Sequence, residues 1–134
     1  LKNEKIDVYN HGDMKRDFTF IDDIVEGITR VLNKKPTPNN KFNSEKPDPA
    51  TSLAPYRIFN IGNSNPENLM SYINCIEKSL DKKANINLMP IQPGDVKYTS
   101  ASVKELYDWV GYKPSTNIQS GVTKFVEWYL SYIK

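Results

Sequence analysis

The sequence alternates short segments of strand periodicity with longer segments of helical periodicity, and this order restricts the possible folds most. Apolar and polar residues alternate, as in strands, over residues 6–9 and 86–89, and residues 57–61 are also predicted to be a strand, ended by Gly62. Elsewhere apolar residues recur every three or four positions, as on one helix face, most clearly from Ile21 to Leu32. The order of strand, helix, loop, strand, helix, strand, short helix and helix predicts an α/β or α+β domain without an internal repeat.

The starts of the later helices are predicted from capping patterns. A Ser or Thr followed three residues later by Glu or Gln can cap a helix reciprocally. Three such pairs precede apolar helical segments, at Ser64/Glu67, Ser102/Glu105 and Thr116/Gln119. Gly111 is placed to end the helix that the second pair begins. Asp22 and Asp23 occupy the first turn of the first helix, where they point about 100° apart and cannot share a proton as a catalytic pair.

Residues 34–55 interrupt the pattern with a polar, proline-rich insertion. Five of the nine prolines of the chain fall within it, and few of its side chains could be buried. We expect a long loop there, and disorder is most expected in this segment. The other residues suffice for one core, so residues 1–134 are predicted to form a single domain.

Composition excludes several classes of protein. A net charge of +2 is too small to indicate a nucleic-acid partner, which needs clustered Lys and Arg. Because the chain has one cysteine, Cys75, and one histidine, His11, no internal disulfide, zinc site or other metal site is predicted. Cys75 lies in an apolar helical segment and is expected to pack as a small hydrophobic residue. No apolar run reaches the roughly 20 residues of a membrane span, and no signal peptide is recognised, so a cytoplasmic protein is expected.

Arg16 is the strongest candidate for ligand binding. Its guanidinium is a planar fork that can bind phosphate oxygens through two parallel hydrogen bonds, and Lys15 adds positive charge beside it. If the segment is extended, Phe18 points to the same side and offers an aromatic face to a nucleotide. The alternative is a surface ion pair with Asp17 or Asp22 and a buried Phe18, and local chemistry alone favours this alternative.

A second candidate site lies at residues 92–95, with the sequence Gln-Pro-Gly-Asp. A Pro-Gly turn holds the backbone tightly enough to aim the carboxylate of Asp95 at both hydroxyls of a ribose. Gln92 carries hydrogen-bond donors and acceptors. The alternative is an ordinary β-turn in which Asp95 accepts hydrogen bonds from local backbone amides, and the spacing alone favours this interpretation.

Four aromatic residues near the C-terminus offer a different kind of surface. Trp109, Trp128, Tyr129 and Tyr132 could stack on nucleic-acid bases. Their helical spacing instead favours packing in the core or against another domain.

Four segments, taken in order, resemble the extended short-chain dehydrogenase/reductase family of NAD-dependent nucleotide-sugar epimerases. They are residues 16–24, 54–63, 92–96 and 111–114, and the resemblance covers essentially the whole chain. Within this family, the chain most resembles the branch of UDP-glucuronate 4-epimerases of capsule and cell-wall polysaccharide synthesis. The resemblance implies an α/β fold: the C-terminal substrate-binding portion of a Rossmann-like enzyme, with short strands and about four helices. It also implies that the cofactor-binding domain is absent from the chain.

The resemblance assigns six residues to substrate binding, namely Arg16, Phe18, Asn65, Gln92, Asp95 and Thr99. Arg16 matches the arginine that binds the nucleotide diphosphate, with Phe18 as an aromatic beside it. Asp95 matches the carboxylate that holds the uridine ribose. Asn65 lies in a turn that borders the uracil and ribose, and Thr99 borders the site. UDP-galactose epimerases have an arginine where Gln92 stands here, so a diphosphate contact from this position is not assured.

The implied reaction is a transient NAD-dependent oxidation at the sugar C4, which converts UDP-glucuronate to UDP-galacturonate. The chain shows no glycine-rich dinucleotide loop and no Tyr-x-x-x-Lys pair, so we predict no catalytic residue and no NAD-binding residue in it. NAD would bind to the missing domain, the fragment alone would be inactive, and the full-length protein would be a homodimer. The alternatives are another epimerase, dehydratase or decarboxylase of the superfamily, or a non-catalytic nucleotide-sugar binding module or interaction domain.

Overall fold

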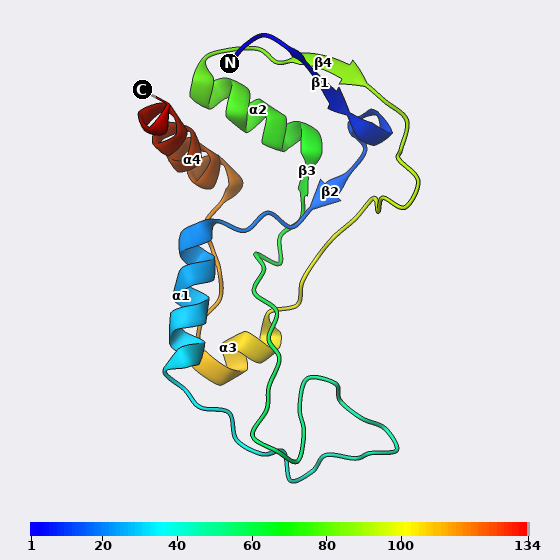
Figure 1. Cartoon of the computed structure of the whole chain (residues 1–134), viewed down its shortest axis with the longest axis vertical. Coiled ribbons are helices and arrows are strands. Elements are labelled where there is room, and N and C mark those ends of the chain that lie inside the picture. Colours follow the sequence, from blue (N-terminus) through cyan, green and yellow to red (C-terminus); the bar gives the residue numbers. More distant parts are fainter. Residues whose placement is uncertain (134) are drawn as a thin grey trace.

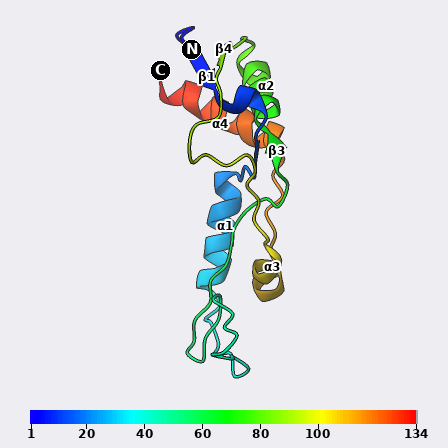
Figure 2. The ribbon, with the colours of Figure 1, turned by 90° about the vertical axis from the view of Figure 1, so that its right-hand side faces the viewer.

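The computed structural model describes residues 1–133 as an α/β chain with four α-helices and short strands (Figure 1). The strands are β1 (Lys5–Val8), β2 (Lys15–Arg16), β3 (Glu67–Asn68) and β4 (Asn85–Leu88). The helices are α1 (Ile21–Leu32), α2 (Leu69–Leu80), α3 (Lys104–Val110) and α4 (Ile118–Tyr132), with a 3-10 turn η1 (Tyr9–Gly12) after β1. The molecule is elongated, and the loop of residues 33–60 lies far from both termini (Figure 2).

One end of the molecule, the helix-pair part, consists of β1, β4, α2 and α4. Strands β1 and β4 pair in parallel, in register from Lys5 with Asn85 to Val8 with Leu88. Helix α2 packs against α4 beside this sheet (Figure 1). Apolar side chains of the two helices form the core between them: Cys75, Val122 and Val126, surrounded by Tyr72, Ile76, Leu80 and Ile118. The prediction that Cys75 packs as a small hydrophobic residue is thus confirmed.

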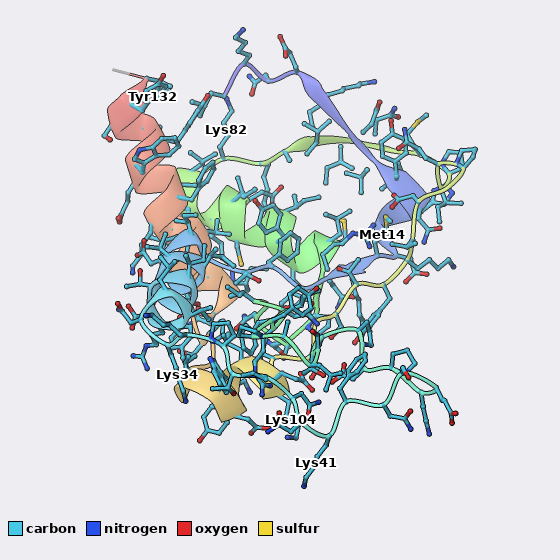
Figure 3. All side chains as sticks on the ribbon, turned by 60° about the horizontal axis from the view of Figure 1, so that its bottom comes forward. Met14, Lys34, Lys41, Lys82, Lys104 and Tyr132 are labelled. Carbon is cyan, nitrogen blue, oxygen red and sulfur yellow. The ribbon has the colours of Figure 1, made fainter. Side chains whose placement is uncertain are left out.

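The other end, the loop part, consists of α1, α3 and residues 33–66. Helices α1 and α3 lie side by side in both ribbon views (Figures 1 and 2). Gly27 of α1 allows a close approach, because a Cβ at this position would lie 3.3 Å from two side-chain carbons of Ile61. Leu106 of α3 and Pro114 are fully buried. Figure 3 shows Lys34, at the end of α1, beside α3.

The long loop is anchored on Trp109 of α3. The Nζ of Lys34 lies 4.5 Å from the centroid of the Trp109 ring, and the Cζ of Arg57 lies 4.3 Å from it. These are cation–π distances, and Lys34 also donates a hydrogen bond to the backbone carbonyl of Trp109. Residues 34–55 contain no helix and no strand, as expected, and polar side chains such as Asp48 and Ser52 cap their turns.

The predicted strand at residues 57–61 is wrong. Of residues 57–61, Arg57 alone forms a bridge, an isolated one with Thr51, and the Ile58 amide donates to the Ala50 carbonyl, but the segment is not part of a strand. A strand needs a neighbour to satisfy its backbone hydrogen bonds. Here the apolar side chains contact helices instead, since Phe59 stacks on Trp109 with ring centroids 6.3 Å apart and Ile61 packs on Gly27.

The three capping pairs do not act as predicted. Helix α2 begins at Leu69, because Glu67 pairs in β3 and the Ser64 hydroxyl donates to the carbonyl of Ala101. Helix α4 is capped by Asn117, whose side chain accepts from the Ser120 amide. Helix α3 begins at Lys104, whose amide donates to the Ser102 hydroxyl at 3.4 Å, while the N-cap residue Val103 makes no side-chain cap bond. At α2, a tertiary hydrogen bond takes the serine from the local pattern. The prediction that Gly111 ends α3 is confirmed by its φ of +66°.

Helical apolar faces are only half buried in this chain. On α4, Val122 and Val126 face the core. Trp128 and Tyr132 are 56% and 75% exposed, so the prediction that these two aromatic residues pack in the core is wrong. Residues on one side of α1 are likewise exposed: Ile21, Val25, Ile28 and Leu32. The alternative for the aromatic residues, packing against another domain, stays a prediction. Across residues 1–133, none of the helices combines the length and apolar character needed to cross a membrane.

Candidate functional site

The candidate site is built around β2, which has neighbours along both edges. On one edge β2 pairs antiparallel with β3. On the other edge, residues 97–99 run beside it: the Lys15 amide donates to the Lys97 carbonyl at 2.8 Å, and the Thr99 amide donates to the Lys15 carbonyl at 3.2 Å. The buried Met14 precedes β2 (Figure 3), and its carbonyl accepts from the amide of Leu69, the first residue of α2, at 2.9 Å. Segments distant in sequence are therefore joined at one strand of two residues.

This arrangement brings Arg16 and Asp95 together. The Nη2 of Arg16 donates to the Oδ1 of Asp95 at 2.9 Å, and both side chains are partly exposed. Residues 92–95 form the expected β-turn, in which the Asp95 amide donates to the Gln92 carbonyl and Gly94 has a φ of +84°. Asp95 also accepts from the Val96 amide at 2.8 Å. The β-turn and the local amide bond predicted for Asp95 are confirmed, but the same carboxylate also pairs with Arg16. The ion pair of Arg16 with Asp17 or Asp22, given as the alternative for Arg16, is wrong.

Sequence reasoning missed the role of Asp17. Its Oδ1 accepts from the Asn63 amide at 3.1 Å, and its Oδ2 accepts from the amides of Ser64 and Ala101 at 3.1 and 3.0 Å. One carboxylate thus ties three segments together. Gly62 completes this junction, because a Cβ there would lie 2.7 Å from the Ala101 Cβ. No local signal reveals these bonds, since the donors lie 46 to 84 residues away.

Two more predicted residues lie beside β2. The Oγ1 of Thr99 accepts from the Asp17 amide at 3.2 Å. The Nδ2 of Asn65 donates to the Oε1 of Glu67 at 3.1 Å, and Glu67 pairs with Arg16 in the β2–β3 register. Arg16, Asp95, Thr99 and Asn65 are therefore brought to the same short strand and its neighbours.

Phe18 and Gln92 are placed differently. Phe18 stacks on Tyr72 of α2, with ring centroids 4.3 Å apart and planes 7° apart. It lines a cavity of about 260 Å³ together with Phe125 and the first turn of α4, and neither Arg16 nor Asp95 lines that cavity. Gln92 is exposed at the start of the turn that holds Asp95. The aromatic face predicted beside the arginine thus belongs to a separate hollow.

A second carboxylate organises the loop part. Asp23 accepts from the backbone amides of Ser115 and Thr116 at 3.3 and 2.9 Å. The Tyr112 hydroxyl donates to the Asp23 carbonyl oxygen at 3.0 Å and lies 3.3 Å from its carboxylate. Burial, followed by the negative charge of Asp23, raises the pKa of Tyr112 above 10.0. Asp23 is occupied by the backbone, as expected for a residue that is not half of an acid–base pair.

Three glycines lie in loops or at a helix end, where a phosphate could bind, and each of them has another role. Gly62 is packed against Asp17 and Ala101, Gly94 forms a turn, and Gly111 ends a helix, so none belongs to a glycine-rich phosphate loop. Strand β1 leads into a 3-10 turn and not into a long helix whose N-terminus could face a pyrophosphate. A search of residues 1–133 finds no cluster of three His, Cys, Asp or Glu side chains that could hold a metal.

Comparison with known proteins identifies the family. The family profile described as GDP-mannose 4,6 dehydratase matches residues 1–125. The chain belongs to this family. It is similar to the CapI protein of Staphylococcus aureus, with 50% identity over 134 residues, which are all of this chain and 40% of that protein. A probable UDP-glucuronate 4-epimerase of Rhizobium meliloti (strain 1021) is 42% identical over 125 residues, or 92% of this chain and 37% of that protein.

Solved structures of nucleotide-sugar enzymes share the fold of this chain. A UDP-glucuronic acid 4-epimerase variant from Bacillus cereus, solved with UDP-4-deoxy-4-fluoro-glucuronic acid and NAD, matches with a TM-score of 0.76 and 22% identity. The match covers all of this chain and 37% of that one. This structural match concerns the fold; the family profile and the two curated relatives confirm the predicted family of extended short-chain dehydrogenase/reductase epimerases. The chain spans about 40% of the length of the curated relatives it matches.

Proposed function

We propose that this chain is the substrate-binding portion of a UDP-sugar 4-epimerase whose substrate is UDP-glucuronate and whose product is UDP-galacturonate. The observation that carries the proposal is the meeting of Arg16 and Asp95, 79 residues apart in sequence, at a distance of 2.9 Å. The names of the relatives support the substrate class, since the Rhizobium protein is called a probable UDP-glucuronate 4-epimerase. A Bacillus cereus relative was solved with a UDP-sugar analogue.

The two side chains match adjacent parts of a nucleoside diphosphate. The Arg16 guanidinium is a planar fork that suits phosphate oxygens, and its side chain is 25% exposed. The Asp95 carboxylate can accept hydrogen bonds from both ribose hydroxyls. Since the ribose and the diphosphate are covalent neighbours, one UDP group would contact both residues. We assign the diphosphate to Arg16 and the ribose to Asp95.

The flanking residues receive supporting roles in this proposal. Asn65 and Thr99 border the nucleoside from the two edges of β2, while Gln92 offers an amide from the turn that carries Asp95. Phe18 stacks on Tyr72 in the neighbouring hollow, so it has no direct contact with UDP in this proposal. In the family reaction NAD supplies the oxidation and reduction at C4. The residues of this chain bind and orient the UDP group, and we propose that the chain alone is inactive and binds no NAD.

Titration calorimetry of the chain with UDP and with uridine tests the proposal. UDP should bind much more tightly than uridine, and Arg16→Ala should weaken UDP binding by about 2 kcal/mol, because a charge-assisted bond is lost. Arg30→Ala is the matched control, since Arg30 is an exposed arginine that pairs with Glu26 on α1 and lies over the Tyr112 ring, and it contacts neither Arg16 nor Asp95. Equal affinities for UDP and uridine, or equal UDP affinities of Arg16→Ala and Arg30→Ala, would contradict the diphosphate site.

A second substrate class is suggested by the family description itself, which names GDP-mannose. Displacement of UDP by GDP-mannose or another nucleotide sugar in the same titration would favour a different epimerase, dehydratase or decarboxylase. A non-catalytic binding module would bind UDP as tightly as the full-length relatives do. A homodimeric full-length protein and a cytoplasmic location stay predictions of the family resemblance.

A further inference from the structure

The protein itself occupies part of the hydrogen-bonding capacity of Arg16. Its Nη2 donates to Asp95 at 2.9 Å, and its Nη1 donates to the carbonyl of Lys15 at 3.1 Å. Each of the two terminal nitrogens of the guanidinium therefore already uses one N–H group in a hydrogen bond within the protein. A phosphate that approaches Arg16 meets the negative charge of Asp95 within hydrogen-bond distance of the same guanidinium.

The backbone keeps Asp95 at this position. The Pro93–Gly94 turn closes through a hydrogen bond from the Asp95 amide to the Gln92 carbonyl at 3.1 Å. The Val96 amide donates to the same Oδ1 that Arg16 contacts, at 2.8 Å. Arg16 is itself held in β2, between β3 and residues 97–99. The backbone of both residues is therefore held in place, and an anion that approaches Arg16 must compete with Asp95 or share Arg16 with it.

Ligands differ in what they offer to Asp95. A ligand that contains only phosphate has no hydrogen-bond donor for the Asp95 carboxylate, and the negative charge of the carboxylate repels the phosphate. A nucleotide brings ribose hydroxyls, which donate to Asp95 and replace the bond that Asp95 loses from Arg16. We infer that Asp95 is a specificity-determining residue, which lowers the affinity of Arg16 for phosphate-only ligands and admits those that carry a ribose next to the diphosphate. This inference rests on the proposed function.

Calorimetry with inorganic pyrophosphate and with UDP tests the inference on the wild-type chain and on Asp95→Asn. The asparagine keeps the shape and one acceptor oxygen but removes the charge. Pyrophosphate affinity should rise about two- to fivefold, the range expected for release of a partly exposed ion pair. UDP affinity should fall, because the loss of a charge-assisted ribose bond, about tenfold, exceeds that gain.

Asp13→Asn is the matched control for net charge. Asp13 lies near the same strand but contacts Lys97, at 3.8 Å, and not Arg16. It should leave both affinities almost unchanged. In an Arg16→Ala background, Asp95→Asn should produce no gain for pyrophosphate, because the gain comes from releasing Arg16. Thermal unfolding of each variant confirms that the fold is retained.

The two arms separate the possible failures. If pyrophosphate binds Asp95→Asn no better than wild type or Asp13→Asn, the inference is overturned, whatever happens with UDP. If UDP binds wild type no better than uridine, the proposed function fails, while the pyrophosphate arm still reports whether Asp95 occupies Arg16. The inference is supported if Asp95→Asn binds pyrophosphate more tightly and UDP more weakly than wild type, while Asp13→Asn shows neither change.

Discussion

The two ends of the molecule are stabilised in different ways. In the helix-pair part, the side chains of α2 and α4 form a core in which Cys75, Val122 and Val126 are each less than 10% exposed. In the loop part, α1 leaves one apolar side exposed, and the carboxylates of Asp17 and Asp23 join the segments by accepting backbone amides. The candidate site lies where the two parts meet, at β2.

This difference has a consequence for the site. Apolar packing is non-directional and tolerates small shifts, whereas a carboxylate that accepts several amides specifies the position of each segment. Asp17 places residues 63–64 and 101 relative to β2, and Arg16 is its direct neighbour in sequence. The geometry of the site is therefore determined mainly by polar contacts, and the helix-pair part provides the rigid support.

Truncation of Leu106 should have the largest effect, and it tests whether the loop part has a core of its own. Leu106 is fully buried, so Leu106→Ala should lower the free energy of unfolding by about 3 kcal/mol. Val126→Ala in the helix-pair part should cost about 2 kcal/mol, because fewer buried carbons are removed. Urea unfolding measures both. A cost below about 1 kcal/mol for Leu106→Ala would mean that the loop part contributes little to cooperative stability.

Asp17→Asn should have an intermediate effect and tests the polar junction. The amide group replaces one acceptor oxygen by a donor that faces backbone N–H groups, so the free energy of unfolding should fall by about 2 kcal/mol. Asp22→Asn is the control, since its carboxylate is 72% exposed and 3.9 Å from Lys124. Equal stability of the two variants would show that the junction is held by packing.

Acid should have the smallest effect, and in the helix-pair part it should act through Glu77. Hydrogen bonds from the Lys83 side chain and then from the Ala84 amide lower the pKa of Glu77 below its usual 4.5. Because the pKa of Glu77 is lower in the folded than in the unfolded protein, ionised Glu77 stabilises the fold at pH values above its usual pKa. This stabilisation is lost as the pH falls through the pKa of the folded protein. Between about pH 6 and about pH 3, the thermal midpoint should therefore fall more steeply for wild type than for Glu77→Gln. The exposed Glu127 provides the control Glu127→Gln, which should keep the wild-type slope.

Much of the architecture could be predicted from the sequence because periodicity is a local property. The helix at Ile21–Leu32, the strands near residues 6 and 86, and the helix end at Gly111 were expected and are present. The strand at 57–61 was wrong because a strand depends on a partner, which no local pattern provides. The helix starts at Leu69 and Ile118 differ from the capping pairs because Ser64 bonds to Ala101 and the Thr116 amide bonds to Asp23.

The chemical types at the candidate site were determined by the sequence alone: an arginine, a Pro-Gly-Asp turn and the order of motifs that indicates the family. The tertiary structure decided which of these residues meet. It joined Arg16 to Asp95 and not to Asp17, made Asp17 the junction of three segments, and turned Phe18 toward Tyr72. The physical reason is that residue type and periodicity are encoded within a few positions. Each of these contacts instead depends on chain segments that only the completed fold brings together.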